Sequence, residues 1–315
     1  MLDKILLILL CCTSLIFSPQ SEARSHHHKA HHAKRSNSLN VNARIVMIFD
    51  EHNQTSMFDK NADKVTSIAS ITKLMTAMVV LDANSPMDEI LTIGEDEVKV
   101  RRSNSRLKKG DKFTRAEMIQ LALMSSENRA ALALARAYPG GLEECIKAMN
   151  EKAEDLGMEH SQFFEPTGLD KNNKSTANDL VKMVIAASSY PEIHLATTTT
   201  SHLVDSLPRK TLLYHNTNPL VSSSEWDINV SKTGYISQSG RCLVMRTIIN
   251  DKIVVIIILN SKTKKSRVSD AKLIKSWTEK QPKVKEQSEL AMKFLMEDLK
   301  LPSEFNIQVE NNKLQ

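Results

Sequence analysis

The stretch "CLVMRTIINDKIVVIIIL", residues 242–259, decides the fold of this chain. It contains two runs rich in apolar and β-branched residues, 242–249 and 253–259, which the polar residues Asn250-Asp251-Lys252 join. This pattern predicts two antiparallel strands connected by a tight turn. Another run of the same kind, "WDINVSK" at 226–232, comes just before them. We therefore expect a three-stranded meander late in the chain.

A further strand is expected near the other end of the chain, at "ARIVMIF", residues 43–49, where a polar turn follows. Between these strands, helical periodicity dominates from residue 70 to about 190, and one more helix is expected near 267–278. A sheet built from both chain ends with a large helical insert is an α+β fold. A cleft is expected where the sheet and the insert meet.

Residues 1–23 have the features of a cleaved signal peptide. A lysine lies near the start, an apolar core runs from 5 to 17, and Ser21-Glu22-Ala23 offers a small-x-small cleavage site. The core is shorter than the roughly 20 apolar residues that span a bilayer. We therefore expect an exported, soluble protein with at most peripheral membrane association.

The remaining chain divides into three predicted parts. Residues 24–39 are basic and contain five histidines, which favours a disordered, solvated linker over a metal site. Residues 40–281 are expected to form one folded domain, and 282–315 a short tail. The tail contains one amphipathic helix of mixed charge, for which packing on the domain is favoured over a membrane anchor.

Composition indicates a domain held together by a hydrophobic core. Apolar residues make up 41% of the chain, and only Cys145 and Cys242 follow the predicted signal peptide. We favour two buried thiols over a disulfide bridge between them. The chain has 42 Lys and Arg against 37 Asp and Glu, a balance that favours association with anionic polymers but says nothing of reaction type.

A first candidate motif lies in "SIASITKLMTA", residues 67–77, where Ser70 precedes Lys73 by three positions. Apolar residues recur through this stretch at helical spacing, so the two polar side chains can meet at the start of a buried helix. Free backbone N–H groups there would stabilise a developing oxyanion. Alone the motif is weak: Ser-x-x-Lys also occurs at Ser105, Ser261 and Ser269, and a helix cap followed by a solvated lysine is the plainer interpretation.

Two further motifs come later in the chain. Ser126-Glu127-Asn128 lies between the predicted helices "RAEMIQLALM" (115–124) and "RAALALARAY" (129–138). A loop pinned there could hold a proton relay and a substrate amide, although a plain inter-helix turn has the same composition. Lys232-Thr233-Gly234 ends a predicted edge strand and could bind a carboxylate, although it could also be only a charged edge.

Taken together and in this order, the three motifs resemble the penicillin-binding proteins and serine β-lactamases. The segments "LMSSENRAALALA", "EPTGL", "STANDL" and "KTGYISQSGRCLVM" are more narrowly similar to the low-molecular-mass serine D-alanyl-D-alanine peptidases, the S11 family. This resemblance covers roughly residues 40–280. It implies a β-lactamase/transpeptidase-like α+β fold and a periplasmic endopeptidase that cleaves D-alanyl cross-links in peptidoglycan.

The resemblance also implies partners and roles. Peptidoglycan peptide stems and β-lactam antibiotics are the expected partners, with no nucleic acid, no metal and no organic cofactor. Ser70 would be the acylated nucleophile and Lys73 its base, with a pKa lowered by burial and by the charge of Lys232. The other implied roles are Ser126 as proton relay, Asn128 as holder of the peptide amide, Lys232, Thr233 and Gly234 as the carboxylate site, and the N–H groups of Ser70 and Tyr235 as the oxyanion hole.

Three alternatives remain at this stage. A D-alanyl-D-alanine carboxypeptidase of the same family would use the same residues. A serine β-lactamase would need a deacylating base, for which Glu165 in "FFEPTGLD" is the candidate, but the expected asparagine after Glu-Pro is missing and a loop role is favoured. A wall-binding module without turnover would dock peptide stems in the cleft and leave them intact.

Overall fold

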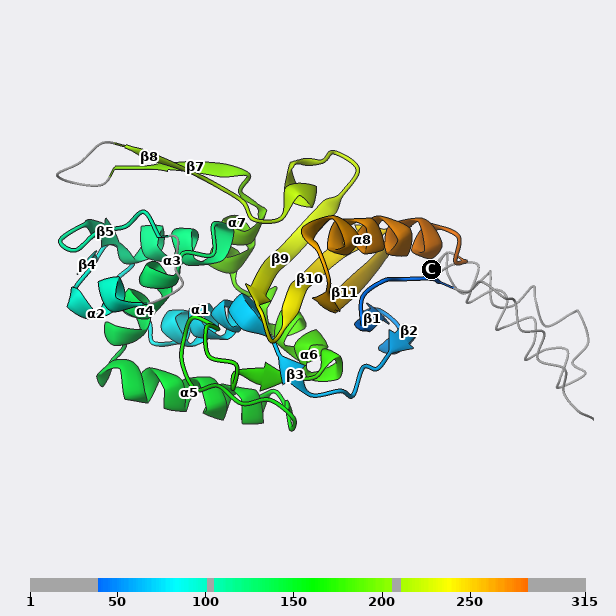
Figure 1. The fold of residues 1–315 in the computed structure, drawn as a ribbon, viewed down its shortest axis with the longest axis horizontal. Helices are drawn as coiled ribbons and strands as arrows, with labels where there is room; N and C mark the ends of the chain where they lie inside the picture. Colours follow the sequence, from blue (N-terminus) through cyan, green and yellow to red (C-terminus); the bar gives the residue numbers. More distant parts are fainter. Residues whose placement is uncertain (1–38, 101–104, 206–210, 283–315) are drawn as a thin grey trace, which may run out of the picture. The chain divides into compact units, whose positions relative to one another are not determined.

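A computed structural model describes residues 39–100, 105–205 and 211–282. The predicted signal peptide, nearly all of the histidine-rich linker and nearly all of the tail lie outside these ranges. The described residues contain a five-stranded antiparallel sheet in the order β2-β1-β11-β10-β9 (Figure 1). Its strands are β1 (Ile45–Asp50), β2 (Thr55–Lys60), β9 (Asp227–Ile236), β10 (Gly240–Ile249) and β11 (Lys252–Ser261).

The predicted meander and the predicted early strand are confirmed. Asn250 and Asp251 both adopt positive φ, 54° and 62°, as a two-residue hairpin turn of the primed type requires. The register pairs Ile45 in β1 with Leu259 in β11, so both ends of the domain share one sheet. The sequence does not predict strand β2, because "TSMFDK" is mostly polar. The strand lies at the edge of the sheet, where it pairs with β1 alone.

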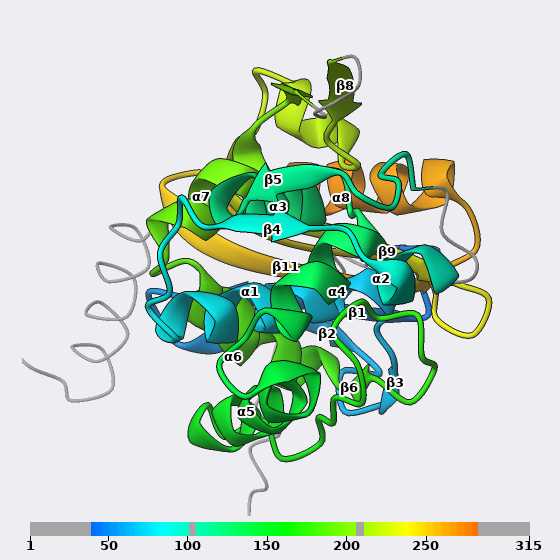
Figure 2. The same cartoon turned by 90° about the vertical axis from the view of Figure 1, so that its left-hand side faces the viewer.

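The continuous apolar run of β11 is explained by cover on both faces of the sheet. Val254, Ile256 and Ile258 belong to the core beneath α8 (Lys264–Glu279), whereas alternate residues of the strand face the helical part. Figures 1 and 2 show α8 on the opposite side of the sheet from α1 (Thr72–Asp82) and α6 (Ala177–Ala187). A central strand buried on both faces has no polar face to alternate with.

The helical part is built around α1. All of its residues from Thr72 to Val80 are buried, so it is apolar all round rather than amphipathic. Against it pack α3 (Arg115–Met124), α4 (Asn128–Arg136), α5 (Gly141–Asp155) and α7 (Pro191–Thr198), and α2 (Glu95–Lys99) packs on α4. The capping box expected at the start of α3 is present, since Thr114 accepts a hydrogen bond from the backbone of Glu117 at 3.1 Å and returns one to its carboxylate.

Three short two-stranded sheets were not predicted. They are β3 (Thr66–Ser67) with β6 (Lys174–Ser175), β4 (Ile90–Thr92) with β5 (Lys112–Thr114), and β7 (Ser201–Val204) with β8 (Leu212–His215). Strands of two to four residues are too short to show a period of two. The β7–β8 hairpin lies at the top of both views in Figures 1 and 2.

Cys145 and Cys242 are both buried and both free, as the favoured interpretation predicted. Burial raises the pKa of the Cys145 thiol to about 12, so it behaves as a small apolar side chain. None of the helices in the described ranges has the length and apolar character needed to cross a membrane.

Candidate active site

Ser70 lies on a short 3₁₀ turn, Ala69–Ile71, that leads directly into α1. The sequence predicted the first turn of the α-helix itself, but the α-helix begins only at Thr72. The difference arises because Ala69 adopts φ of +49° where the chain leaves β3, so the first turn closes by an Ile71 to Ile68 hydrogen bond of 3.2 Å. Ser70 is nonetheless at the N-terminal end of the buried helix, as expected.

Lys73 is the centre of the predicted site. Its Nζ lies 2.9 Å from Ser70 Oγ, 2.6 Å from Asn128 Oδ1 and 2.5 Å from the carbonyl oxygen of Thr167. An ammonium group has three N–H donors, and three oxygens are in place to accept them. The predicted contact between Ser70 and Lys73 is therefore present, together with a partner in Thr167 that sequence reasoning missed.

The electrostatic surroundings of Lys73 agree with a role as base. Its side chain is only 1% exposed, and this burial lowers its pKa to about 8 against the opposing charges of Glu165 and Glu127. Lys232 is equally buried, and desolvation, the charge of Lys73 and the charge of Arg267 lower its pKa well below the ordinary value. The lowering by burial that the sequence analysis expected for Lys73 is thus found, and burial acts in the same way on Lys232.

The Ser126 loop joins α3 to α4, as the sequence predicted. Ser126 adopts φ of +62°, and Glu127 caps the next helix by accepting a hydrogen bond from the backbone N–H of Arg129 at 3.2 Å. Asn128 is the first residue of α4 and turns its Oδ1 toward Lys73. Within the described residues, the Ser126 hydroxyl makes no hydrogen bond to Ser70 or Lys73.

Lys232 and Thr233 lie on β9, the edge strand of the sheet, as predicted. Lys232 Nζ donates to the carbonyl of Thr233 at 3.0 Å, and the Thr233 hydroxyl donates to that of Thr217 at 2.8 Å. The backbone N–H of Thr217 in turn donates to the carbonyl of Met124, at the end of α3. Thr217 therefore connects β9 to α3, the helix before the Ser126 loop. No sequence pattern predicts this connection.

Gly234 brings β9 against the turn that carries Ser70. A Cβ atom at this position would lie 3.0 Å from the backbone nitrogen of Ser70 and 3.0 Å from the Cβ of Ala69. Only glycine fits such an approach without displacing the turn. Tyr235 follows with a half-exposed ring, which the guanidinium of Arg241 covers at 3.5 Å. The two predicted oxyanion donors thus come from adjoining backbone segments.

The loop from Glu165 to Asn173 completes the site. Its Gly168 has φ of +81°, and a Cβ there would lie 1.9 Å from the carbonyl oxygen of Ala69, so the loop packs directly on the Ser70 turn. The Glu165 carboxylate is occupied by donors of its own loop, which agrees with the favoured loop role. The sequence pointed to Glu165 but not to Thr167. The contact of Thr167 with Lys73 is made by its backbone carbonyl, so the identity of its side chain does not predict it.

This arrangement combines a serine hydroxyl, a buried lysine of lowered pKa in contact with it, and a second buried lysine on the edge strand. Such a set suits acyl transfer on a substrate that carries a carboxylate near the reacting carbonyl. Among the described residues, no group of three or more His, Cys, Asp or Glu side chains could hold a metal ion.

Comparison with known proteins agrees with this chemistry. The S11 peptidase family model, described as D-alanyl-D-alanine carboxypeptidase, matches residues 29–263. A D-alanyl-D-alanine endopeptidase of Escherichia coli is 42% identical over 84% of this chain and 84% of its own length. One from Pseudomonas aeruginosa is 43% identical over 74% of this chain and 76% of its own length.

Solved structures give the same result. The DD-transpeptidase of Streptomyces K15 superimposes with a TM-score of 0.70 and 28% identity, covering 76% of this chain and 97% of its own. Penicillin-binding protein D2 of Listeria monocytogenes, in its cefotaxime-bound form, gives a TM-score of 0.68 and 27% identity over 76% and 99%. The predicted α+β transpeptidase-like fold is therefore confirmed, and the chain belongs to the S11 family of serine D-alanyl-D-alanine peptidases.

Proposed function

We propose that this protein is a periplasmic D-alanyl-D-alanine endopeptidase that cleaves peptidoglycan cross-links through an acyl-enzyme on Ser70. The observation that carries the chemistry is the contact of 2.9 Å between Lys73 Nζ and Ser70 Oγ at a fully buried lysine. Cleavage of cross-links is supported by relatives: endopeptidases are 42% and 43% identical, whereas a carboxypeptidase of Bacillus subtilis is 26% identical.

The first step requires a change in the Lys73 hydrogen bonds. When Lys73 loses a proton, it keeps two N–H donors for Asn128 Oδ1 and the Thr167 carbonyl, and its lone pair accepts the Ser70 O–H instead. Ser70 Oγ then attacks the D-alanyl carbonyl while its proton passes to Lys73. The N–H groups of Ser70 and Tyr235 stabilise the oxyanion, each by roughly 3 kcal/mol in such sites.

The other residues act on the substrate and the leaving group. Lys232 holds the carboxylate on the D-centre that follows the scissile amide, and the Thr233 hydroxyl joins it by turning its O–H from Thr217 to the substrate. Asn128, whose oxygen is turned to Lys73, has its N–H donors left for a substrate carbonyl. Ser126 relays the proton from Lys73 to the departing amine, and water then hydrolyses the ester. β-Lactams mimic the acyl-D-alanyl group and acylate the same serine.

The experiment that tests this function uses labelled penicillin and a purified cross-linked muropeptide dimer. We expect a stable covalent adduct with penicillin and, in its absence, conversion of dimers to monomers. Rapid turnover of the adduct with intact dimers would identify a β-lactamase. Binding of the dimer with no cleavage and no adduct would identify a wall-binding module.

A further inference from the structure

We propose that Glu165 is a positioning residue that fixes the carbonyl of Thr167 as an acceptor for Lys73. One carboxylate oxygen accepts from the backbone N–H of Thr167 at 2.8 Å and from its hydroxyl at 2.5 Å. The other accepts from the N–H groups of Gly168 at 2.5 Å and Asp170 at 3.4 Å. The carboxylate therefore folds the loop around itself and sets the direction of the Thr167 peptide.

Asn173 secures the same loop to the segment that carries the nucleophile. Its carboxamide donates to the Glu165 carbonyl at 2.7 Å, to the Glu165 carboxylate at 3.2 Å and to the Thr72 hydroxyl at 3.1 Å. The Asn173 carbonyl accepts from the N–H of Ile68 at 3.1 Å. Because Asn173 is fully buried, these bonds are shielded from water and hold the loop in register with Ser70 and Lys73.

The consequence is that Glu165 acts through Lys73 rather than on the substrate. Its carboxylate accepts from donors within its own loop, so it is poorly placed to activate a water for deacylation. Its negative charge also raises the pKa of Lys73 against the effect of burial. Removal of that charge should make Lys73 easier to deprotonate. It should also weaken the hydrogen bonds that hold the loop, and with it the Thr167 carbonyl that positions Lys73.

The variant Glu165→Gln separates these effects. A carboxamide keeps one acceptor but places an NH2 group against N–H donors, so part of the loop loses its partner. We expect penicillin acylation to slow about tenfold to a hundredfold, its acid limb to move to lower pH, and the adduct lifetime to stay within about threefold of wild type. Glu159→Gln removes an exposed carboxylate six positions earlier and should change none of these.

Two outcomes would overturn this role of Glu165. Unchanged acylation in Glu165→Gln would show that the loop does not determine the position of Lys73. Unchanged acylation with a greatly lengthened adduct lifetime would make Glu165 the deacylating base. If the Gln variant does not fold, Glu165→Asp keeps the charge: we expect slower acylation with an unshifted acid limb, and wild-type acylation would contradict the proposal.

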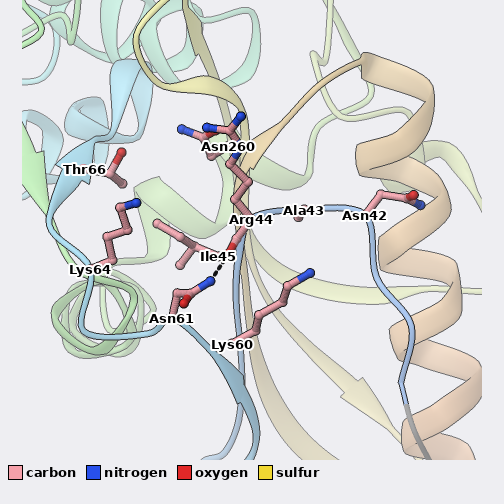
Figure 3. A pocket seen from close by; sticks show the side chains of 9 residues that line it. All are labelled: Asn42, Ala43, Arg44, Ile45, Lys60, Asn61, Lys64, Thr66 and Asn260. Atoms are coloured by element: carbon pink, nitrogen blue, oxygen red, sulfur yellow. Dashed lines mark hydrogen bonds between the residues drawn. The ribbon is translucent and has the colours of Figure 1, made fainter.

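A separate observation supports a second inference, about a basic pocket of about 390 Å³ at the start of β1. We infer that it binds an anionic group of the cell wall, a carboxylate or a phosphate. Arg44, Lys60 and Lys64 line it together with Asn61, Thr66 and Asn260. Figure 3 shows Lys64 and Thr66 on one side of the pocket and Arg44 and Asn260 on the other.

One carboxylate contacts the lining of this pocket: Asp270 accepts from the backbone N–H groups of Asn42 and Ala43. Among the described residues no carboxylate forms an ion pair with Arg44, Lys60 or Lys64. Lys60 donates to the carbonyl of Val41 at 3.0 Å, and Arg44 and Lys64 are exposed. Three cations around one hollow attract an anion with several oxygens.

Two residues that line the pocket lie close to segments that lead to the active site. Thr66 begins β3, four residues before Ser70, and the backbone of Asn260 lies against Gly240 at the turn from β9 to β10. We therefore expect a polymer with one stem in the cleft to place a neighbouring group in the pocket. Resting on the proposed function, we assign the occupant as a carboxylate of a peptide stem on the same wall strand.

The test is sedimentation with purified cell walls in a Ser70→Ala background, which prevents digestion. Arg44→Ala/Lys64→Ala should bind walls about tenfold more weakly, whereas Lys112→Ala/Lys272→Ala, which removes two exposed cations elsewhere, should not. If the ligand is a carboxylate, the difference in binding between the two double variants should persist with walls stripped of phosphate polymers. If that difference disappears, the ligand is a phosphate. Equal binding by both double variants would overturn the proposal.

A failure of this inference can be distinguished from a failure of the proposed function. With Ser70 intact, the Arg44→Ala/Lys64→Ala variant should keep wild-type penicillin acylation and wild-type cleavage of a small soluble dimer. Loss of acylation in this variant would mean that the pocket belongs to the catalytic machinery, and would contradict a separate wall site.

Discussion

At the scale of single residues, the proposed mechanism depends on the removal of one proton from a pair of buried lysines. Lys73 and Lys232 are both about 1% exposed, and their charges repel. In the proposed mechanism, the productive state has a neutral Lys73 as base and a protonated Lys232 that binds the substrate carboxylate. A carboxylate in the cleft favours that state, because it stabilises the charge on Lys232 and leaves Lys73 as the group that releases its proton.

This distribution of charge predicts the pH dependence of acylation. Because Lys73 must be neutral and burial lowers its pKa to about 8, the acylation rate at low penicillin concentration should rise about tenfold per pH unit well below 8, and it should fall again at the pH where Lys232 loses the proton that the productive state requires. Stopped-flow acylation between pH 5.5 and 9.5 measures this limb. A rate that is flat across pH 6 to 8 would contradict a role for Lys73 as base.

The nucleophile can be tested against a second Ser-x-x-Lys motif in the same chain. Ser70→Ala should abolish labelling by penicillin with little change in stability, because a half-buried hydroxyl is replaced by a smaller side chain. Ser269→Ala, at an exposed position of α8, should label like wild type. Mass spectrometry of the intact protein detects the adduct. Stoichiometric labelling of Ser70→Ala would exclude Ser70 as the nucleophile.

At the scale of elements, the sequence predicts the strands, helix ends and loops that leave a local pattern of periodicity or motif spacing. The three late strands, the early strand, the capping box of α3 and the Ser126 loop follow from local patterns. Two contacts could not be predicted: the hydrogen bond from Lys73 to the Thr167 carbonyl and the link through Thr217. A backbone carbonyl and a single threonine do not form a recognisable sequence pattern. The 3₁₀ turn at Ser70 follows from the positive φ of Ala69, and no local pattern predicts this φ or the close approach of Gly168 to Ala69.

That close approach predicts a difference between two glycine substitutions. Gly168→Ala must move the loop off the Ala69 carbonyl as well as accept φ of +81°, so it should destabilise the fold by about 3 to 5 kcal/mol and slow acylation. Gly110→Ala, with φ of +89° and open space around it, should cost only about 1 to 2 kcal/mol. Urea unfolding measures both. Equal losses would mean that the packing of the loop on Ala69 contributes nothing.

At the scale of the whole molecule, the fold places each part of the site on a different structural unit. Ser70 and Lys73 come from the central helix and its leading turn, Asn128 from α4, Thr167 from a loop, and Lys232 from the edge strand of the sheet. The edge position leaves one side of β9 without a neighbouring strand in the sheet, and in the proposed function an extended peptide stem lies along that side. The choice between cross-linked and terminal peptides depends on what lies beyond this shared site.

The most direct measurement of the central claim compares two substrates at equal concentration. Initial rates are measured on a purified cross-linked dimer and on a monomeric pentapeptide ending in D-Ala-D-Ala, with Ser70→Ala as the blank for each. We predict faster cleavage of the dimer and loss of both activities in the blank. Faster release of free D-alanine from the pentapeptide would make the protein a carboxypeptidase and contradict the account.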